Sequence, residues 1–220
     1  MTNAMDSQRL LRLVERVALD LETAQPYLTE LDGALGDGDH GVSVTIGCRG
    51  VRKALPAQAG RPLAEVLHQV GTTFQAAAGA TVGALFGTAL THAAAALEQN
   101  QQPSAQDLAR ALRAATDAVM QLGGAGPGDK TMVDCLLPAT AAFERSVDQG
   151  HDAFDALEAA LAGAKGGVEA TRSMLARKGR ASRLGERTRG HIDPGATSTF
   201  LIFQSVHRNL QEDRGTRSQP

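Results

Sequence analysis

Three aspartates lie close together in the glycine-rich stretch DGALGDGDHG. Asp32, Asp37 and Asp39 have no positively charged neighbour, because no lysine or arginine occurs between Arg16 and Arg49. Glycines permit the tight turns that would bring three short side chains to one point. Mg²⁺ prefers carboxylate and water oxygens and commonly shares them with substrate phosphates. The stretch therefore predicts a Mg²⁺ site, with an exposed acidic turn as the alternative.

The residues that follow are candidates for holding the anion that accompanies such a cation. His40 comes directly after the last aspartate, and Gly41, Val42 and Ser43 begin a predicted helix. The first N–H groups of a helix have no acceptor within it and attract anions. We expect this turn to contact a phosphate or a ribose; the alternative for His40 is a loop histidine paired with backbone.

Two further glycine-rich stretches are candidates for ligand contact. In GATVGALFG, Gly79, Gly83 and Gly87 would share one helical face, which indicates either close helix packing or a turn whose amides reach a phosphate. GGAGPGDKT resembles a phosphate-binding P-loop, but Asp129 separates the last glycine from Lys130 and no predicted strand precedes it. We expect Asp129 to cap a helix that begins at Lys130, with the glycines leaving room for a flat ligand.

A basic stretch, RKGRASRLGERTRGHIDPGATS, leads into the last predicted helix. Nucleic-acid binding is disfavoured, because no aromatic residue interleaves for stacking and the formal net charge of the chain is −2. Recognition of a phosphate or an acidic partner by arginines is the functional interpretation, and a solvated charged loop is the alternative. Asp193 would cap the last helix or contact a ligand, and Pro194 suits its first turn. The basic residues in and just before the stretch are Arg172, Arg177, Lys178, Arg180, Arg183, Arg187 and Arg189.

Helices must position these loops. The chain is rich in alanine, lacks tryptophan and has one tyrosine, a composition that favours helix over strand. We predict one all-α domain over residues 1–220, with a polar tail at 212–220 that frays, and no convincing strand. Pro26 either ends the first helix or starts a new turn. The predicted helices span about 6–22, 42–55, 62–77, 80–97, 104–123, 130–146, 151–164, 167–178 and 194–209, and the predicted functional loops are 32–41, 123–130 and 179–197.

Charge and cysteine content argue against several classes of protein. Cys48 and Cys135 lie far apart without a C-x-x-C pattern, which disfavours a disulfide framework or a zinc site and indicates reduced thiols. Residues 66–97 lack Asp, Glu, Lys and Arg and are long enough to span a membrane, but their alanine, glycine, threonine, histidine and glutamine content favours a buried helical hairpin. No signal peptide is recognisable. We expect a cytoplasmic protein with neither a membrane nor a nucleic-acid partner.

Four stretches together carry a resemblance to a known family. ALGDGDHG, GALFGTA, GPGDKTMVD and GRASRLGERTRGHIDPGATS occur in the order and spacing found in the nucleotide-binding L subunit of bacterial dihydroxyacetone kinase, of the type that depends on the phosphotransferase system. The resemblance covers nearly the whole chain. It implies an antiparallel eight-helix barrel that binds ADP or ATP and two Mg²⁺ ions at one end.

The resemblance also implies roles for individual residues. Asp32, Asp37 and Asp39 match the family's metal ligands, and Arg180 would stabilise the charge that develops during phosphoryl transfer. The family usually has serine where Val82 stands, and the missing hydroxyl would weaken nucleotide binding by about 1–2 kcal/mol. The family's nucleotide contacts match His40, Gly41, Val42, Ser43, Val82, Gly83, Gly124, Met132, Arg180, Asp193, Pro194 and Gly195.

The implied reaction needs partner proteins. A separate K subunit would hold dihydroxyacetone covalently on a histidine and receive the phosphoryl group there. An M subunit of the phosphotransferase system would rephosphorylate the bound ADP in place. Two alternatives stay open at this point: a nucleotide-sensing partner of a transcription factor, and a kinase subunit for another small keto-sugar. The sequence leaves open whether the chain forms a homodimer.

Overall fold

The computed structural model describes residues 5–98, 100 and 102–215, and these residues form helices and loops without any strand. The prediction of an all-α chain is therefore confirmed. The α-helices are α1 (Ser7–Thr23), α2 (Gln25–Gly33), α3 (His40–Ala54), α4 (Leu63–Ala78), α5 (Ala80–Ala95), α6 (Ala105–Gly123), α7 (Val133–Asp148), α8 (Ala153–Thr171) and α9 (Pro194–Gly215), with the 3₁₀ helices η1 (Leu55–Gln58) and η2 (Arg180–Thr188).

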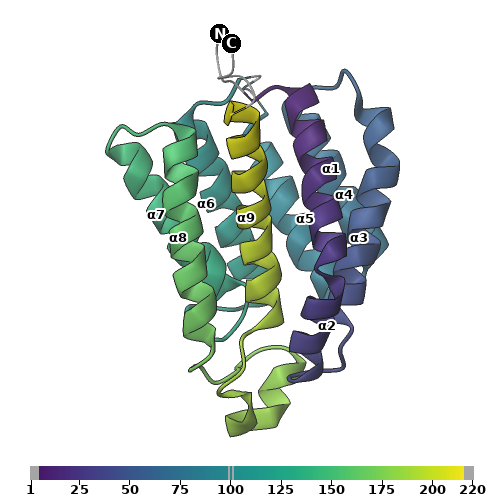
Figure 1. Cartoon of the computed structure of the whole chain (residues 1–220), viewed down its shortest axis with the longest axis vertical. Coiled ribbons are helices and arrows are strands. Elements are labelled where there is room, and N and C mark those ends of the chain that lie inside the picture. Colours follow the sequence, from purple (N-terminus) through teal and green to yellow (C-terminus); the bar gives the residue numbers. More distant parts are fainter. Residues whose placement is uncertain (1–4, 99, 101, 216–220) are drawn as a thin grey trace.

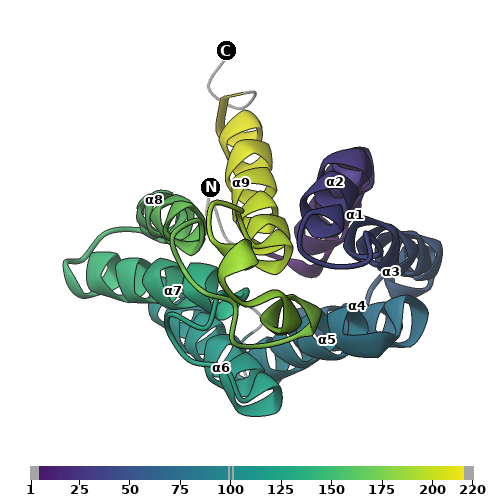
Figure 2. The same ribbon diagram turned by 90° about the horizontal axis from the view of Figure 1, so that it is seen from below.

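The long helices alternate in direction and pack in chain order (Figure 1). From α3 to α9 each α-helix contacts the next. Helix α1 contacts both α3 and α9, so the last helix of the chain packs against the first. Figure 2 shows the molecule from the end that lies at the bottom of Figure 1, and η2 and its flanking segments lie across this end. The alternation places the α2–α3, α4–α5, α6–α7 and α8–α9 connections at this same end (Figure 1). These connections contain the sequence motifs singled out above.

Small residues allow the helices to approach closely. A Cβ atom added at Gly83 would lie 2.7 Å from the carbonyl oxygen of Gln75, and one added at Gly87 would lie 2.6 Å from the Cβ of Gln75. Between α7 and α8, a Cβ added at Gly167 would lie 2.1 Å from the carbonyl oxygen of Asp134. The helix-packing interpretation of Gly83 and Gly87 is therefore confirmed. The predicted hairpin is formed by α4 and α5, but it is only partly buried, because most residues of α5 are half-buried or exposed.

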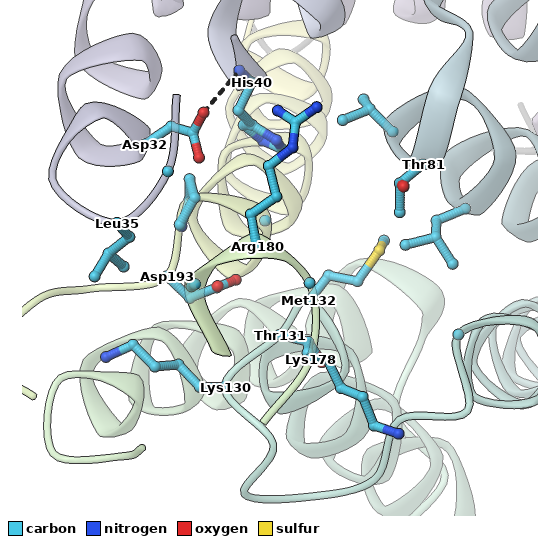
Figure 3. A pocket seen from close by; sticks show the side chains of 18 of the residues that line it. Asp32, Leu35, His40, Thr81, Lys130, Thr131, Met132, Lys178, Arg180 and Asp193 are labelled. Carbon is cyan, nitrogen blue, oxygen red and sulfur yellow. Dashed lines mark hydrogen bonds between the residues drawn. The ribbon is translucent and has the colours of Figure 1, made fainter. Parts of the chain in front are cut away.

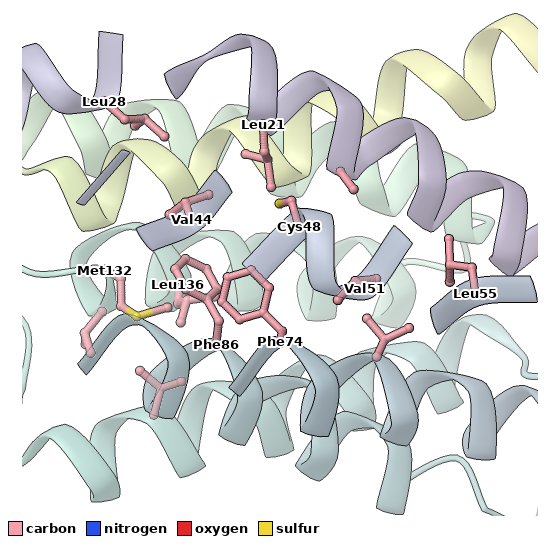
Figure 4. Packing of buried hydrophobic residues seen from close by; sticks show 14 of the residues in the cluster. Leu21, Leu28, Val44, Cys48, Val51, Leu55, Phe74, Phe86, Met132 and Leu136 are labelled. Atoms are coloured by element: carbon pink, nitrogen blue, oxygen red, sulfur yellow. The ribbon is translucent and has the colours of Figure 1, made fainter. Parts of the chain in front are cut away.

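A cluster of apolar side chains fills the interior between α1, α3, α4, α5 and α7 (Figure 4). The rings of Phe74 and Phe86 meet edge to face with centroids 5.7 Å apart, a favourable aromatic geometry. Cys48 lies in this cluster and Cys135 in a second one, and both thiols are free and buried. Burial raises the pKa of Cys48 to about 12. The thiols are thus packing groups, as their spacing predicted.

Local capping residues set several helix ends where the sequence placed them. Ser104 forms a capping box at the start of α6, and Gly124 ends that helix in the left-handed region at a φ of 53°. Pro194 begins α9, and the Asp193 carboxylate accepts a hydrogen bond from the Ala196 N–H, so Asp193 caps this helix as predicted. Pro26 starts a new helix, α2, and does not simply end the first one.

Two predicted helix boundaries are wrong. Asp129 does not cap a helix at Lys130: its carboxylate accepts from the Gly126 N–H, and Lys130 has a φ of 61°, which a helix does not allow. The helix begins only at Val133, because Asp134 binds the N–H groups of Gly128 and Thr131.

The second error concerns residues 167–178, which were expected to form a separate short helix. The first part of this segment continues α8 without a break to Thr171, and the rest forms a turn and loop. The glycine pair at 166–167 therefore does not end the helix, because Gly167 is needed for close packing on α7.

The last helix extends beyond its predicted end at residue 209. Helix α9 continues to Gly215, and residues 216–220 of the expected frayed tail lie outside those described. Within the described ranges, every helix is too short or too polar to cross a membrane.

Candidate functional site

A pocket with a volume of about 320 Å³ opens at the end of the molecule where the motif-bearing connections meet. Its lining comes from the amino ends of α3, α5 and α9, from the loops before α3 and α7, and from the start of η2 (Figure 3). Segments far apart in sequence thus share one cavity. The predicted site residues in its lining are Asp32, Asp37, Asp39, His40, Ser43, Val82, Met132, Arg180, Asp193, Pro194 and Gly195.

The three aspartates converge as their spacing predicted. One carboxylate oxygen from each of Asp32, Asp37 and Asp39 lies within 4.8 Å of the others. Asp32 accepts a hydrogen bond from the backbone N–H of His40 at 3.1 Å, which ties the loop to the start of α3. Asp37 and Asp39 are about half exposed, so water can complete the ligand set of a cation. Hard carboxylate donors at this separation fit a Mg²⁺ ion.

Arg180 joins this acidic cluster from the opposite side of the pocket. Its guanidinium donates to the carboxylate of Asp39 at 3.0 Å and also to that of Asp37. Hydrogen bonds to these two carboxylates raise the pKa of Arg180. The loop before α3 and the start of η2 are therefore held together by charge, and a positive side chain faces the predicted metal position.

His40 lies buried at the start of α3, with its ring directed toward α9. Its Nε2 is 3.0 Å from the hydroxyl of Ser198, and that hydroxyl donates to the carbonyl of Gly195. The Ser198 hydroxyl therefore lies between the His40 ring and the backbone at the start of α9. Burial lowers the pKa of His40, while Asp32 and Asp39 oppose this shift. The alternative to ligand contact for His40 was a hydrogen bond between its ring and the backbone. In the structure the ring pairs instead with the side chain of Ser198.

Four predicted contact residues are outside the pocket lining. Gly41 packs on α2, where an added Cβ would lie 2.4 Å from the carbonyl oxygen of Gln25. Val42 is exposed on the outer face of α3. Gly83 packs on α4, and Gly124 ends α6 beside Gly123 and Ala125, which do line the pocket.

The turn before α5 presents backbone groups to the pocket. Gly79 and Ala80 have φ values of 62° and 44°, and this turn directs the helix start toward the cavity. Ala80, Thr81 and Val82 line it, and the N–H groups of a first helical turn lack acceptors within the helix. The start of α5 thus faces the pocket, and contact of its amides with a phosphate stays a prediction. Thr81, which sequence reasoning missed, adds a hydroxyl to the pocket lining (Figure 3).

Asp193 is a buried acid in the wall of the pocket. Its Oδ2 caps α9, and its N–H donates to the hydroxyl of Thr171 at 3.0 Å. Burial is the main reason why the pKa of Asp193 rises to about 7. An added Cβ at Gly195 would lie 3.1 Å from this carboxylate, so the glycine leaves space at the helix start.

The basic stretch divides into pocket residues and loop-folding residues. Lys178 and Arg180 line the pocket. Arg172 donates to the carbonyl of Gly190, and Arg189 binds Glu186 and the carbonyl of Ser173. Only part of this positive charge therefore faces a ligand.

Comparisons with known proteins agree with this geometry. Residues 34–208 match the DAK2 domain family. The chain is 41% identical to the ADP-binding subunit of the PEP-dependent dihydroxyacetone kinase of Escherichia coli, over 84% of this chain and 88% of that protein. It is 31% identical to an ADP-binding subunit of a PEP-dependent dihydroxyacetone kinase of Listeria innocua, over 94% of this chain and 97% of that protein.

Longer proteins also contain this unit. A D-erythrulose kinase of Mycolicibacterium smegmatis is 38% identical over 89% of the chain, which spans 34% of that protein. The crystal structure of the dihydroxyacetone kinase of C. freundii with AMP-PNP and Mg²⁺ superposes on 95% of this chain and 35% of its own length, with a TM-score of 0.71 and 25% identity. This chain therefore belongs to the DAK2 domain family, alongside the ADP-binding subunits of dihydroxyacetone kinases.

Proposed function

We propose that this chain is the ADP-binding subunit of a dihydroxyacetone kinase and transfers a phosphoryl group from a Mg²⁺-bound nucleotide to dihydroxyacetone held by a separate K subunit. One observation carries the proposal: three converging aspartates, the amino ends of α3 and α5, and Arg180 share a single pocket. A cation site beside free helix amides is the arrangement that a nucleotide's phosphates require.

Each part of the pocket has a role in binding. Asp32, Asp37 and Asp39 would hold two Mg²⁺ ions, which when bound neutralise phosphate charge. The N–H groups at the starts of α3 and α5 would bind phosphate oxygens, with Ser43 and Thr81 adding hydroxyl donors. Met132 and the glycine-containing turn after α6 provide an apolar wall for the flat base. The other contacts carried over from the resemblance belong to this proposal.

Arg180 has the role most closely tied to the transfer itself. Its guanidinium lies beside the predicted metal ligands and carries a permanent positive charge. Released from Asp37 and Asp39, the side chain can follow the charge that develops on the transferring group. We therefore assign Arg180 as the catalytic residue of this subunit.

The relatives favour one acceptor and one phosphoryl source. Those matched over nearly their whole length are named as PEP- or PTS-dependent dihydroxyacetone kinase subunits. The erythrulose kinases are about three times as long as their matching part. We propose that dihydroxyacetone is the acceptor, that an M subunit rephosphorylates ADP in place, and that the complex works in the cytoplasm. Because these relatives are kinases, transfer is favoured over a purely regulatory role.

Two measurements test the proposal in sequence. Mass spectrometry of the purified chain and calorimetric titration should show Mg²⁺-dependent ADP binding; a protein that binds neither ADP nor Mg²⁺ refutes the proposal. The chain is then combined with candidate K and M subunits and with either dihydroxyacetone or erythrulose. Phosphorylation of dihydroxyacetone is expected, and bound ADP without transfer to either sugar would favour regulation.

A further inference from the structure

Lys130 is a lysine whose charged group lies inside the protein. The residue is 2% exposed and has a φ of 61°, a conformation that side chains other than glycine rarely adopt. Its ammonium nitrogen donates to the backbone carbonyl oxygens of His191 at 2.6 Å, Thr188 at 2.7 Å and Thr171 at 2.8 Å, with Met174 at 3.3 Å. An ammonium has three hydrogens, so the three short contacts use them all.

The four carbonyls belong to the two limbs of one loop. Thr171 and Met174 lie where α8 ends, and Thr188 and His191 lie where the chain returns toward α9. The loop between these limbs carries Arg180 at its tip, and Asp193 follows its second limb. In Figure 3 the side chains of Lys130 and Lys178 extend in opposite directions. The Lys130 ammonium therefore binds both limbs of the loop that supplies Arg180 and Asp193 to the pocket.

Other hydrogen bonds also join the same limbs. The Arg172 side chain donates to the carbonyl of Gly190, the Arg189 side chain donates to the carbonyl of Ser173, and the Asp193 N–H donates to the hydroxyl of Thr171. The Gly190 N–H donates to the carbonyl of Arg172 at 2.7 Å, and the Ala176 N–H donates to the hydroxyl of Thr188 at 3.0 Å. The Arg177 N–H donates to the carbonyl of Asp129, the residue directly before Lys130. Ile192 on the second limb also packs in an apolar cluster that includes Val168 of α8. Among these contacts, the ammonium is the group that binds two carbonyls on each limb, so it contributes to holding this loop in shape.

A buried charge is costly unless it is well paired, so its retention needs a reason. Asp193 is the acid whose charge favours the protonated lysine, while burial lowers the pKa of Lys130. An apolar side chain in its place would leave carbonyls of both limbs without a donor. Four carbonyl oxygens surround the ammonium, as they would surround a bound monovalent cation. Here the cation is part of the chain, because it is the end of the Lys130 side chain.

We propose that Lys130 is a positioning residue of the nucleotide site, whose ammonium joins the two limbs of the 171–193 loop and thereby places Arg180 and Asp193. The inference rests on the proposed function, because the consequence of the placement is read as ADP binding. Lys130 also lines the pocket, but its ammonium is engaged by the four backbone carbonyls, although the GDKT sequence around it resembles a P-loop.

The test removes the Lys130 side chain and supplies its ammonium group as a small amine in solution. Lys130→Gly suits the positive φ and leaves an open, carbonyl-lined channel. Mg²⁺-dependent ADP affinity is measured by calorimetry in sodium chloride and in n-butylammonium chloride of equal ionic strength. We expect affinity to fall at least tenfold in sodium and to recover at least fivefold in n-butylammonium. Lys53→Gly, at an exposed lysine in the last turn of α3, is the matched control and should respond to neither change.

Hydrogen exchange separates this inference from the proposed function. The amides of Ala176, Arg177 and Gly190 should exchange at least tenfold faster in Lys130→Gly than in the parent, and n-butylammonium should restore their protection. A parent protein that fails to bind ADP refutes the proposed function, while the exchange result still decides whether Lys130 orders the loop.

Three results would overturn the inference. The first is an ADP affinity of Lys130→Gly within threefold of the parent, and the second is a loss that the amine does not reverse. If Lys130→Gly does not fold, Lys130→Met is measured in its place, and normal ADP affinity there contradicts the inference. Failure of both variants to fold, even with the amine, would make Lys130 a requirement of the whole fold and would equally overturn it.

Discussion

Asp193→Asn tests whether a buried acid in the pocket wall destabilises the ligand-free protein at neutral pH. The Asp193 carboxyl is buried and accepts a hydrogen bond from the Ala196 N–H at 2.7 Å. Asparagine has the same shape, and its side-chain oxygen can accept this bond, so the cap of α9 is kept. The substitution removes the titration of the group, and with it the carboxylate charge that favours the protonated form of Lys130.

The size of the effect follows from the shift in pKa. Because the pKa of Asp193 rises from 3.8 to about 7 on folding, the folded protein holds a proton that the unfolded chain releases within this range. The contribution of the neutral Asp193 carboxyl to the free energy of unfolding is present in full below pH 3.8, the pKa in the unfolded chain. It is lost as the pH rises through about 7, the pKa in the folded protein. The loss amounts to about 1.4 kcal/mol per pH unit and about 4 kcal/mol in all.

Urea unfolding followed by circular dichroism measures this difference. The free energy of unfolding is determined for the parent and Asp193→Asn between pH 4 and pH 8, without Mg²⁺ or nucleotide. We expect the variant to gain stability relative to the parent by about 4 kcal/mol across this range. Asp152→Asn is a control of opposite sign when it is measured from about pH 5 down to about pH 2. The N–H of Asp155 and other groups lower the pKa of Asp152 at the start of α8, so its contribution to stability is lost as the pH falls through this range.

A difference between Asp193→Asn and the parent that stays constant from pH 4 to pH 8 would refute the reasoning. It would mean that the carboxyl keeps its ordinary pKa in the folded protein and that burial does not control its charge. A difference that falls with rising pH would show a carboxylate stabilised as an anion, the reverse of the argument.

Three further predictions concern the pocket and its frame. Asp37→Ala should abolish Mg²⁺-dependent retention of ADP because it removes one of three converging ligands, and unchanged retention in equilibrium dialysis would contradict the metal assignment. Val82→Ser should strengthen ADP binding by about 1–2 kcal/mol, or roughly fivefold to thirtyfold in calorimetry, by restoring a hydroxyl at the start of α5; an unchanged affinity would indicate that Thr81 already supplies it. Gly167→Ala should destabilise the protein by about 1–3 kcal/mol in urea unfolding, because its Cβ would meet the Asp134 carbonyl; a stability equal to that of the parent would show that α7 and α8 can separate without cost.

Local patterns were sufficient to predict most of the helices. Apolar spacing indicated the long helices, while Ser104, Gly124 and Pro194 marked ends whose chemistry depends on neighbours a few residues away. The 3₁₀ helix η2 was not predicted, because its arginines and glycines have no apolar period. Its shape depends on contacts with the end of α8 and with Lys130, which no local pattern contains.

The site was predictable in part for the same reason. Glycine spacing alone indicated that Asp32, Asp37 and Asp39 would converge, and they do. The hydrogen bond from His40 to Ser198 spans 158 positions in sequence, and the ammonium of Lys130 reaches carbonyls 41 to 61 positions away. Such partners are set by how the helices pack, so the sequence pattern around either residue could not identify them.

Because the helices alternate in direction, the segments that connect them lie at two opposite ends of the molecule. The two sets of segments differ in how freely their sequence and length can change. Connections at the pocket end each contribute side chains or amides to one cavity, so an added residue there would displace a ligand contact. At the far end, the described residues of the connections line no part of it; these are 59–62, 96–98, 100, 102–104 and 149–152. The start of α1 and the end of α9 also lie at that end (Figure 1). Fluorescent labels, surface tethers or fused domains attached there would leave the pocket open, which makes the far end the natural point of attachment for engineering this protein.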